Sequence, residues 1–370
     1  MLVSRRSLLS ARLSPEDRAS VPAPGDVKID GNENPLGPGP TAMDALVGMF
    51  DQAGRYPFNS SPSHIDLLAA LADHFDTTPD HFALGLGSSE ILSSAVRLFA
   101  GPDRPVITSG LSFAAPITAA KQYGYPWTGV PLDADLKLDL GAMAEAARGA
   151  GMVYVCNPNN PTATLHSATA IERFVNEVHE TSPETIILID EAYHDYVTDP
   201  AHRTAVPFAI RRPNVVVART FSKAYGMAGL RLGYGVGHVE TMEPMRKNQM
   251  SANTNVLVMA AAVASLKDSE HIERERARNT EVRQYVTSFF ERSGFRVPET
   301  QGNFLFVELG QPAAAFRAAC AEQHVFVARD FPPMEKTHCR ISFGTMAEMR
   351  RACRVFADVL GVDAPTEAPQ

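Results

Sequence analysis

Thr220-Phe-Ser-Lys223-Ala-Tyr-Gly-Met-Ala-Gly-Leu-Arg231-Leu-Gly233 is the most informative segment of the sequence. Lys223 directly follows a hydrophobic strand pattern, hydroxyl side chains precede it, and Arg231 follows shortly after. Hydroxyls and a guanidinium group suit a phosphate dianion, which accepts short hydrogen bonds from a planar two-pronged donor. A lysine beside such a site can form an imine with a carbonyl-bearing cofactor. The segment therefore predicts a seat for pyridoxal 5'-phosphate, and the alternative is a solvated surface lysine.

The composition is that of an ordinary globular protein large enough for two domains. The chain has 370 residues, of which 45% are hydrophobic and 21% charged, whereas one domain usually takes about 100–200 residues. A formal net charge of -8 argues against a nucleic-acid partner, which would need a basic surface. No apolar run approaches the roughly 20 residues of a membrane-spanning helix. The four cysteines show no C-x-x-C spacing, so we expect reduced thiols and no metal site.

The N-terminal residues Ser4-Arg5-Arg6 resemble the start of a twin-arginine export signal. Such a signal needs a following apolar segment and a cleavage site with small residues. Charged side chains, beginning with Arg12, interrupt the chain instead. We therefore expect an arm without export function, and a cytoplasmic protein.

Short apolar runs alternate with helical patterns from about residue 41 onwards. Runs such as 185–189 and 214–218 are apolar without alternation, which is typical of strands buried on both faces. This order predicts an α/β fold whose large domain has three layers, α/β/α, around a mostly parallel sheet. The strands expected there are 82–86, 105–108, 152–156, 185–189, 215–218 and 233–236.

A second pattern begins after a long helical stretch at about 240–292. Short strands and helices then alternate, which predicts a smaller α+β domain that part of the N-terminal arm joins. Its expected strands are 296–298, 303–308, 325–328 and 340–342. We expect an arm at residues 1–40, a cofactor-binding large domain at 41–250 and a small C-terminal domain at 251–370.

Polar clusters follow four strands of the predicted large domain. Ligands of open α/β sheets bind at the carboxyl ends of the strands, because the loops converge there. A single site at that edge would explain all the clusters, which are Gly85–Glu90, Asn157–Thr162, Asp190–Tyr193 and Thr220–Lys223.

These clusters offer the groups that pyridoxal phosphate needs. Ser88 and Ser89 open a helix after a glycine turn, where they could bind phosphate or only cap the helix. Asp190 ends an apolar strand, and a buried carboxylate there needs a partner such as a pyridinium nitrogen, unless it caps the next helix. Tyr193 and Asn157 could donate hydrogen bonds to the phenolic oxygen of the cofactor, or serve as a core tyrosine and a turn residue.

The other candidates carry weaker patterns. Phe113 could stack on the pyridine ring or belong to the core. Tyr56 lies in a loop between two expected helices. Arg329 and Arg340 lie near the ends of short strands in the C-terminal third, where they could clamp a carboxylate or phosphate of the substrate or be solvated. The apolar strand pattern around Arg340 favours the clamp.

These motifs together resemble those of fold type I, pyridoxal-phosphate-dependent class I/II aminotransferases, and most closely the histidinol-phosphate aminotransferase branch. They follow the order of the family from about residue 30 to 345. The matching segments are Asn32–Pro35, Arg55–Pro57, Gly87–Glu90, Asn157–Thr162, Asp190–Tyr193, Thr220–Gly233, Gly302–Phe304 and Arg340–Gly344.

The resemblance implies an aminotransferase that moves an amino group from histidinol phosphate or an amino acid to a 2-oxo acid, in a homodimer with shared active sites. Lys223 would hold the cofactor as an imine and move the proton between the substrate Cα and the cofactor C4'. Asp190 would pair with the pyridine nitrogen, and Asn157 and Tyr193 would bind the phenolic oxygen. The implied phosphate ligands are Ser88, Ser89, Thr220, Ser222, Arg231 and Tyr56 of the partner subunit. The implied substrate ligands are Arg340, Arg329 and Asn32.

Departures from the family pattern leave the substrate open. Phe113 stands where the closest branch usually has tyrosine, and Ala163 replaces the last glycine of the loop Asn-Pro-Asn-Asn-Pro-Thr-Gly. Segment 245–255 lacks the proline–phenylalanine signature expected of histidinol-phosphate enzymes. An aromatic amino-acid aminotransferase therefore stays an alternative, as does an amino-acid decarboxylase, cyclase or oxidase on the same fold. A regulatory module is disfavoured because no DNA-binding domain accompanies the fold.

Overall fold

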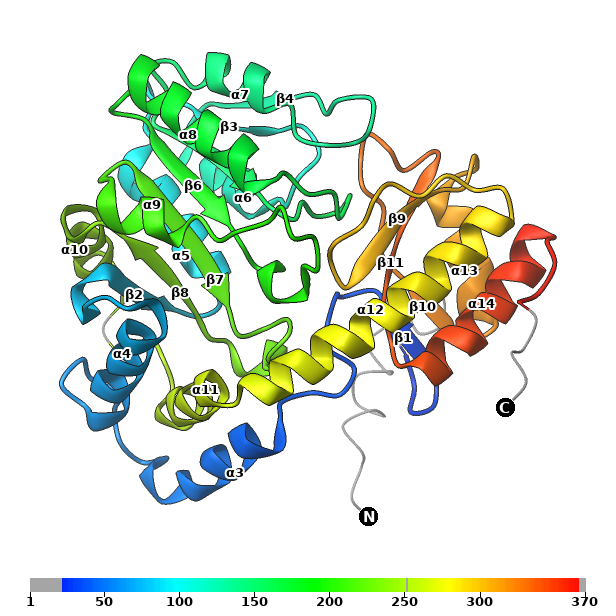
Figure 1. Ribbon diagram of the computed structural model, residues 1–370, viewed down its shortest axis with the longest axis horizontal. Helices are drawn as coiled ribbons and strands as arrows, with labels where there is room; N and C mark the ends of the chain where they lie inside the picture. The colour runs from blue at the N-terminus through cyan, green and yellow to red at the C-terminus, as the bar shows by residue number, and fades with distance from the viewer. Residues whose placement is uncertain (1–21, 251, 366–370) are drawn as a thin grey trace. The chain divides into compact units, whose positions relative to one another are not determined.

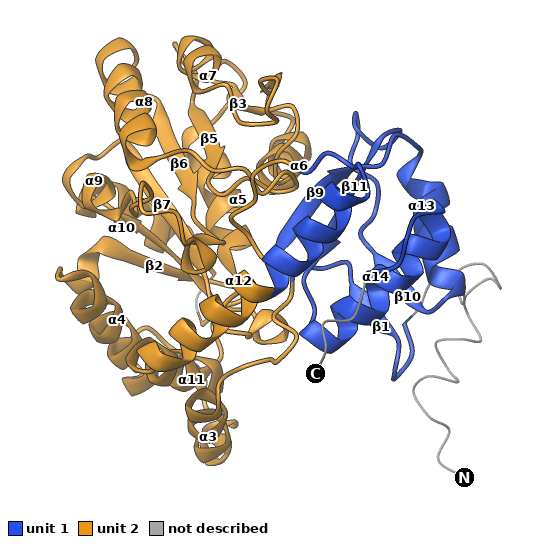
Figure 2. Cartoon of the chain, turned by 45° about the vertical axis from the view of Figure 1, so that its right-hand side comes forward, with its two compact units in different colours: residues 1–32, 282–297, 304–370 blue, residues 33–281, 298–303 orange. Residues whose placement is uncertain are grey.

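The computed structural model describes residues 22–250 and 252–365, which form two compact units (Figure 1). Of the described residues, 33–281 and 298–303 form the larger unit, and 22–32, 282–297 and 304–365 form the smaller one (Figure 2). The start that resembles an export signal lies outside the described residues. Within the described ranges, every helix is too short or too polar to cross a membrane.

A seven-stranded sheet forms the middle of the larger unit, in the order β2-β8-β7-β6-β5-β3-β4. Within it, β8 runs antiparallel to its neighbours β2 and β7, and the other pairs are parallel. The mostly parallel sheet of the prediction is thus confirmed. The strands are β2 (Phe82–Gly85), β3 (Val106–Ser109), β4 (Trp127–Val130), β5 (Met152–Cys156), β6 (Ile186–Asp190), β7 (Val215–Thr220) and β8 (Gly233–Gly237).

Helices cover both faces of this sheet, which confirms the three-layer prediction (Figure 1). One face shares an apolar cluster with α5, α6 and α10, in which Ile91, Ala120 and Met242 meet Leu188 and Val216. In the view of Figure 1, α8 and α9 lie in front of the sheet and α5 lies behind it. The helices are α5 (Ser88–Phe99), α6 (Ala115–Tyr123), α7 (Leu140–Ala146), α8 (Ala168–Thr181), α9 (Val206–Arg211) and α10 (Val239–Lys247).

The long helical stretch expected at 240–292 is three helices, α10, α11 (Val256–Lys267) and α12 (Ser269–Arg292). Helix α11 packs against α3 (Pro40–Gly48) and α4 (Pro62–Phe75). The expected division at residues 250/251 therefore falls inside the larger unit, and the chain leaves this unit only within α12. Short 3₁₀ turns complete the unit: η1 (Phe50–Gln52), η2 (Pro79–His81), η3 (His194–Tyr196) and η4 (Ala228–Leu230).

The smaller unit contains two short sheets and the helices that pack on them. Strand β1 (Val27–Ile29) pairs in parallel with β10 (Val325–Val327), so the N-terminal arm does join this unit as expected. Strand β11 (His338–Ser342) pairs antiparallel with β9 (Phe304–Glu308). Helices α13 (Ala313–Glu322) and α14 (Met346–Leu360) and the end of α12 share one core, in which the Phe356 ring lies 5.8 Å from Phe290 and 5.4 Å from Phe316.

Some elements differ from the prediction. The strand expected at 296–298 is only an isolated bridge between Arg296 and Glu308, because Pro298 has no N–H to donate and begins the short segment that belongs to the larger unit. The sequence pattern did not predict the edge strand β4, which is mostly exposed, or the short helix α9.

Candidate active site

Four strand ends bring most of the predicted residues together in the larger unit. Cys156 pairs with Asp190 across β5 and β6, and Asp190 pairs with Ala218 across β6 and β7. Thr220 pairs with Gly233 at the adjoining end of β8. Because these pairs are in register, the loops that follow β5, β6 and β7 begin side by side at one edge of the sheet.

Asp190 is the last residue of β6, and only 2% of its surface is exposed. Its Oδ2 accepts a hydrogen bond from the Tyr154 hydroxyl at 2.9 Å, and its Oδ1 accepts one from the Ala192 N–H at 3.1 Å. Burial raises the pKa of this carboxyl to about 6, although the two donors and the charge of Lys223 act in the opposite direction. A carboxylate held this way favours a cationic partner.

Lys223 follows β7 and is partly buried beside the loop that follows β6. Its Nζ lies 5.6 Å from the centre of the Tyr193 ring, and its charge reaches Asp190. The Tyr193 hydroxyl in turn accepts a hydrogen bond from the Asn160 side chain at 3.2 Å. The structure therefore brings together the amine, the phenol and the carboxylate that the sequence predicted.

The phosphate-binding candidates gather where α5 begins and β8 starts. The guanidinium group of Arg231, an exposed residue, donates to the Leu86 carbonyl at 3.1 Å and to the Ser222 hydroxyl at 3.4 Å. The Ser222 N–H donates to the Thr220 hydroxyl at 3.1 Å. Ser88 is the first residue of α5, so the N–H groups of its first turn point toward ligands beyond the helix.

Glycines allow this close approach of backbone and guanidinium group. A Cβ on Gly87 would lie 2.5 Å from Arg231 Nη2, and one on Gly233 would lie 2.4 Å from the Ser88 nitrogen. Gly226, which follows Lys223, has a φ of +72° and sits so close to Gly37 that a Cβ would lie 1.9 Å from its carbonyl oxygen. At Gly226 and Gly233 a Cβ would meet backbone atoms, so only glycine fits there without movement of the backbone, whereas at Gly87 it would displace the Arg231 guanidinium group.

Asn157 is held by both ends of its side-chain amide. Its Nδ2 donates to the His166 carbonyl at 3.1 Å and its Oδ1 accepts from the His166 N–H at 2.8 Å. An amide nitrogen carries two hydrogens, so the second hydrogen of Asn157 Nδ2 can be donated to a ligand. Ala163, in the same loop, has a left-handed φ of 60°, a backbone conformation that favours glycine.

Three further candidates from the larger unit differ in their surroundings. Ser89 follows Ser88 in the first turn of α5 and is partly buried. Phe113 is partly buried and packs against the apolar cluster of α5, α6 and α10. Tyr56 is 76% exposed, and its ring centre lies 5.6 Å from that of Phe58.

The predicted substrate residues lie in the smaller unit. The guanidinium groups of Arg329 and Arg340 lie 4.7 Å and 4.8 Å from the centre of the same Phe331 ring. Arg329 is exposed, whereas Arg340 is buried and donates to the Asp30 carbonyl. Asn32 is also buried, and its Oδ1 accepts a hydrogen bond from the Ser342 hydroxyl at 2.6 Å.

Three supporting residues were missed in the sequence. Tyr154 reads as an ordinary apolar strand position, yet it binds Asp190. The Asn34 side chain donates to the Ala224 carbonyl at 3.0 Å and so fixes the residue after Lys223. Buried Arg219 donates to Glu191 at 2.8 Å. A polar residue inside an apolar run is the signal that could have revealed Arg219.

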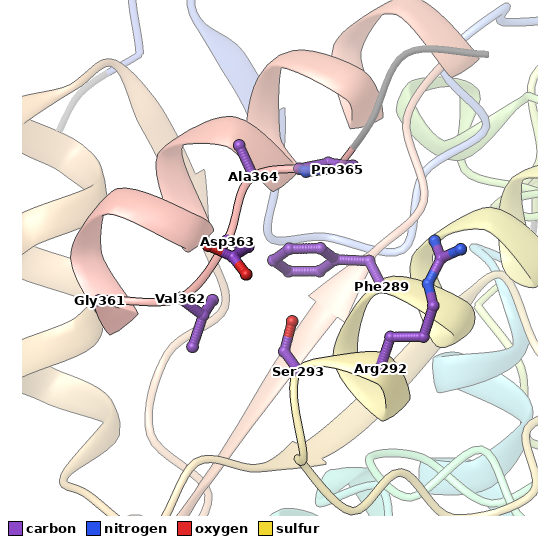
Figure 3. A pocket seen from close by; sticks show the side chains of 8 residues that line it. All are labelled: Phe289, Arg292, Ser293, Gly361, Val362, Asp363, Ala364 and Pro365. Atoms are coloured by element: carbon purple, nitrogen blue, oxygen red, sulfur yellow. The ribbon is translucent and has the colours of Figure 1, made fainter.

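A cavity outside this group of residues contains none of the predicted site residues. It has a volume of about 490 Å³ and lies in the smaller unit, between the end of α12 and the segment after α14 (Figure 3). No group of three or more His, Cys, Asp or Glu residues could hold a metal ion within the described ranges.

The donor set of the larger unit fits pyridoxal phosphate. Gly87 and Gly233 form a cradle that a Cβ would fill, and it is lined by helix N–H groups and the Arg231 guanidinium group, as a phosphate dianion requires. Asp190 provides a buried carboxylate for a protonated ring nitrogen, and Lys223 provides an amine for a carbonyl.

Comparison with known proteins agrees with this chemistry. The family model described as aminotransferase class I and II matches residues 25–356. The chain is 36% identical over 336 residues to a histidinol-phosphate aminotransferase of Symbiobacterium thermophilum, which covers 90% of this chain and 91% of that protein. It is also 36% identical over 318 residues to an aromatic amino acid aminotransferase of Thermobifida fusca, with 86% of each chain covered. A crystal structure of histidinol-phosphate aminotransferase from Sinorhizobium meliloti in complex with pyridoxal-5'-phosphate has a TM-score of 0.84 at 28% identity, over 97% of this chain and 98% of that chain.

Proposed function

The chain belongs to the class I and II aminotransferase family, and we propose that Lys223 holds the cofactor while Arg340, helped by Arg329, binds the acidic group of the substrate. It is a pyridoxal-phosphate-dependent transaminase that moves an amino group between an amino donor and a 2-oxo acid. One observation supports the site assignment best: Lys223 lies near both Tyr193 and Asp190. The cradle of Gly87 and Gly233, which the Arg231 guanidinium group lines, supplies the phosphate site.

In this proposal each group of the larger unit has one task. Ser88, Ser89, Thr220, Ser222 and Arg231 bind the phosphate. Asp190 holds a proton on the ring nitrogen, and the bound ring then acts as an electron sink for the substrate Cα. Tyr193 and the remaining hydrogen of the Asn157 amide bind the phenolic oxygen, and Phe113 lies against the ring. The Lys223 amine holds the cofactor carbonyl carbon and moves the proton at the substrate Cα.

Lys223 gives the proposal a direct test. Purified protein incubated with pyridoxal phosphate should turn yellow, and borohydride followed by peptide mapping should find the cofactor on Lys223. Lys223→Ala should abolish this labelling, whereas Lys247→Ala should not, because Lys247 pairs with Glu243 on an exposed helix face. Labelling of a different lysine, or none at all, would refute the assignment.

We further propose histidinol phosphate as the amino donor, with an aromatic amino acid as the second candidate. Two guanidinium groups beside one Phe331 ring offer the charge that a phosphate dianion needs, whereas a carboxylate needs one of them. The equal identity to an aromatic amino acid aminotransferase keeps the second candidate open.

A half-reaction separates these donors and the other reaction types. The yellow protein is mixed with histidinol phosphate, with aromatic, basic or acidic amino acids, and the visible absorbance is followed before and after a 2-oxo acid is added. A transaminase loses the absorbance with its donor and regains it with the acceptor. Release of carbon dioxide or consumption of oxygen would instead identify a decarboxylase or an oxidase.

The arginines then distinguish the donors. Arg329→Gln should raise KM for histidinol phosphate about tenfold or more, because a charge-assisted hydrogen bond to phosphate is lost. It should change KM for an aromatic amino acid little, since Arg340 binds the carboxylate. Equal effects on both donors would contradict this division of roles.

We also propose a cytoplasmic homodimer that acts in amino-acid biosynthesis and shares its active sites, with the partner's Tyr56 reaching the phosphate. All four cysteines are free and buried, which suits a reducing compartment. A run of exposed apolar side chains on the larger unit suits a covered surface. They are Leu36, Met43, Val47, Phe50, Tyr56, Phe58 and Ile65.

Mixing two damaged variants tests this shared site. Lys223→Ala and Tyr56→Ala homodimers should each have low activity. After the two are exchanged into mixed dimers, one site has both native residues if Tyr56 acts across the interface. Activity should then rise above that of either variant; the absence of any gain, with mixed dimers demonstrated by mass spectrometry, would place Tyr56 in its own subunit's site or in none.

A further inference from the structure

Asp190 has a neighbour that the proposed chemistry does not use. Tyr154 is on β5 and Asp190 on β6, and the register pairs Tyr154 with Leu188 and Cys156 with Asp190. Side chains two residues apart on a strand point to the same face, so Tyr154 and Asp190 are diagonal neighbours on one side of the sheet. The long tyrosine side chain spans this diagonal and places its hydroxyl 2.9 Å from Asp190 Oδ2.

We propose that Tyr154 is a positioning residue, whose hydroxyl holds the Asp190 carboxylate ionised and correctly oriented for the ring nitrogen of the cofactor. This inference rests on the proposed function, because it concerns the group that would meet the ring. Tyr154 touches Asp190 and not the reacting atoms, so it acts through that carboxylate.

Burial makes Tyr154 a fixed donor. Its side chain is fully buried in the apolar cluster of α5, α6 and α10. Burial and the charge of Asp190 raise its pKa well above the usual value, so the hydroxyl keeps its proton throughout the working pH range. An unpaired buried hydroxyl is costly, and Asp190 is the acceptor that the structure provides.

The two donors leave the Asp190 carboxylate little freedom to rotate. Tyr154 binds one oxygen and the Ala192 N–H binds the other. Each carboxylate oxygen has a second lone pair, which is where a ring N–H would bind. Tyr154 thus restricts the direction in which Asp190 can face, as well as its charge.

Several groups around Asp190 determine whether it is ionised near neutrality. Burial favours the neutral acid, and Glu191, the residue that follows β6, adds to that effect. Tyr154, the Ala192 N–H and Lys223 oppose it, and the outcome is a pKa of about 6. Cys156, the remaining titratable neighbour on β5, has its own pKa raised well above the usual value by burial and is neutral. Loss of the Tyr154 donor should therefore move the pKa of Asp190 upward across neutrality.

The test is the pH dependence of pyridoxal phosphate binding by Tyr154→Phe and wild type. Titrations between pH 5.5 and 8.5 give a dissociation constant for each protein at each pH. The constant of Tyr154→Phe is divided by that of the wild type, and the titration of the free cofactor cancels in this ratio. A hydrogen bond to a charged group corresponds to about one to two pKa units. The ratio should therefore be near one at pH 8.5 and reach about 5- to 50-fold at pH 6.

Three comparisons make the result specific. Asp190→Asn should remove the pH dependence of the ratio, because Tyr154→Phe then has no carboxylate to act on. Tyr234→Phe, another buried tyrosine of the same sheet, should leave the pH profile unchanged. Replacement of Tyr154 by 3-fluorotyrosine, a stronger hydrogen-bond donor, should move the pH dependence of pyridoxal phosphate binding to lower pH. This variant tests the role of Tyr154 independently of Tyr154→Phe.

The outcomes separate this inference from the function on which it rests. A wild type that binds no pyridoxal phosphate at any pH would overturn the proposed function. A wild type that binds it, with a ratio that is constant over the pH range, would overturn only the role of Tyr154. A ratio that grows as pH falls, and loses that trend in the Asp190→Asn background, supports it.

Discussion

Arg219→Met should destabilise the larger unit strongly, although Arg219 has no proposed role in binding the cofactor or the substrate. The Arg219 side chain is 6% exposed and its Nε lies 2.8 Å from Glu191 Oε2, while the Glu191 side chain is 2% exposed. Burial lowers the pKa of the guanidinium group, but the Glu191 carboxylate outweighs this and raises it. Methionine keeps most of the apolar stem, so the main change is a buried carboxylate that has lost its cation.

The magnitude follows from what Glu191 keeps. Breaking a buried ion pair by removing one partner costs about 3–5 kcal/mol. Glu191 still accepts hydrogen bonds from the Thr204 hydroxyl at 2.8 Å and the Ala205 N–H at 2.6 Å. We therefore expect the lower end, about 3 kcal/mol, which corresponds to a Tm lower by roughly 6–12 °C for a domain of this size.

Urea unfolding followed by fluorescence measures this loss. Trp127, the one tryptophan of the chain, is on β4 of the larger unit and reports on that unit. Arg211→Met is the control: this arginine is exposed at the end of α9, and its loss should change the unfolding free energy by less than about 0.5 kcal/mol.

A double variant gives the result that would refute the reasoning. Glu191→Gln together with Arg219→Met removes both charges and keeps an acceptor for Thr204 and Ala205. It should be more stable than Arg219→Met alone, by about 1–2 kcal/mol, because the uncompensated charge is gone. The single variant Glu191→Gln is measured as well. If the double variant loses as much unfolding free energy as the two single variants together, the pair is not coupled and the argument is wrong.

Three more predictions concern other parts of the chain. Gly226→Ala should cost about 2–5 kcal/mol, because alanine is strained at φ +72° and its Cβ meets the Gly37 carbonyl oxygen; Gly229→Ala, which meets no atom within 4 Å, is the matched control, and equal urea midpoints would contradict the prediction. Asp190→Asn should stabilise the cofactor-free protein above about pH 6 by about 1–3 kcal/mol, because the raised pKa shows that the charged form is disfavoured in the fold; the gain should vanish below about pH 4, where the native carboxyl is neutral, and a gain independent of pH would exclude this cause. Thr345→Ala removes the capping box of α14 and should cost about 1 kcal/mol, seen as faster hydrogen exchange in the first turns of α14 and not in α8.

Apolar runs that are buried on both faces were the easiest elements to predict. Strand β5 begins at Met152 and ends at Cys156, as expected. Strand β4 has the opposite character: Trp127 is 39% exposed and Gly129 interrupts the pattern, because this strand is at the edge of the sheet. Edge strands carry less of the hydrophobic signal on which such predictions depend.

The site could be predicted to the extent that its residues follow strand ends. Asp190 and Lys223 are polar residues after apolar runs, and the topology of parallel strands brings such residues together. Asn34 binds the backbone at Ala224, 190 positions away, and no local pattern announces that contact. Tyr154 was hidden for a different reason, since a tyrosine in an apolar strand is read as core until its hydroxyl partner on the next strand is known.

The pairing of β1 with β10 bears on the order in which the protein is assembled during synthesis. Val27 pairs with Val325, and Ile29 with Val327. A ribosome delivers residues from the N-terminus onward, so β1 emerges early but has no partner strand until nearly the whole chain has been made. Contacts between such distant segments also close slowly. The larger unit, whose residues lie between them, can fold before β1 finds its partner, and β1, the first strand of the described residues, becomes one of the last to be fixed.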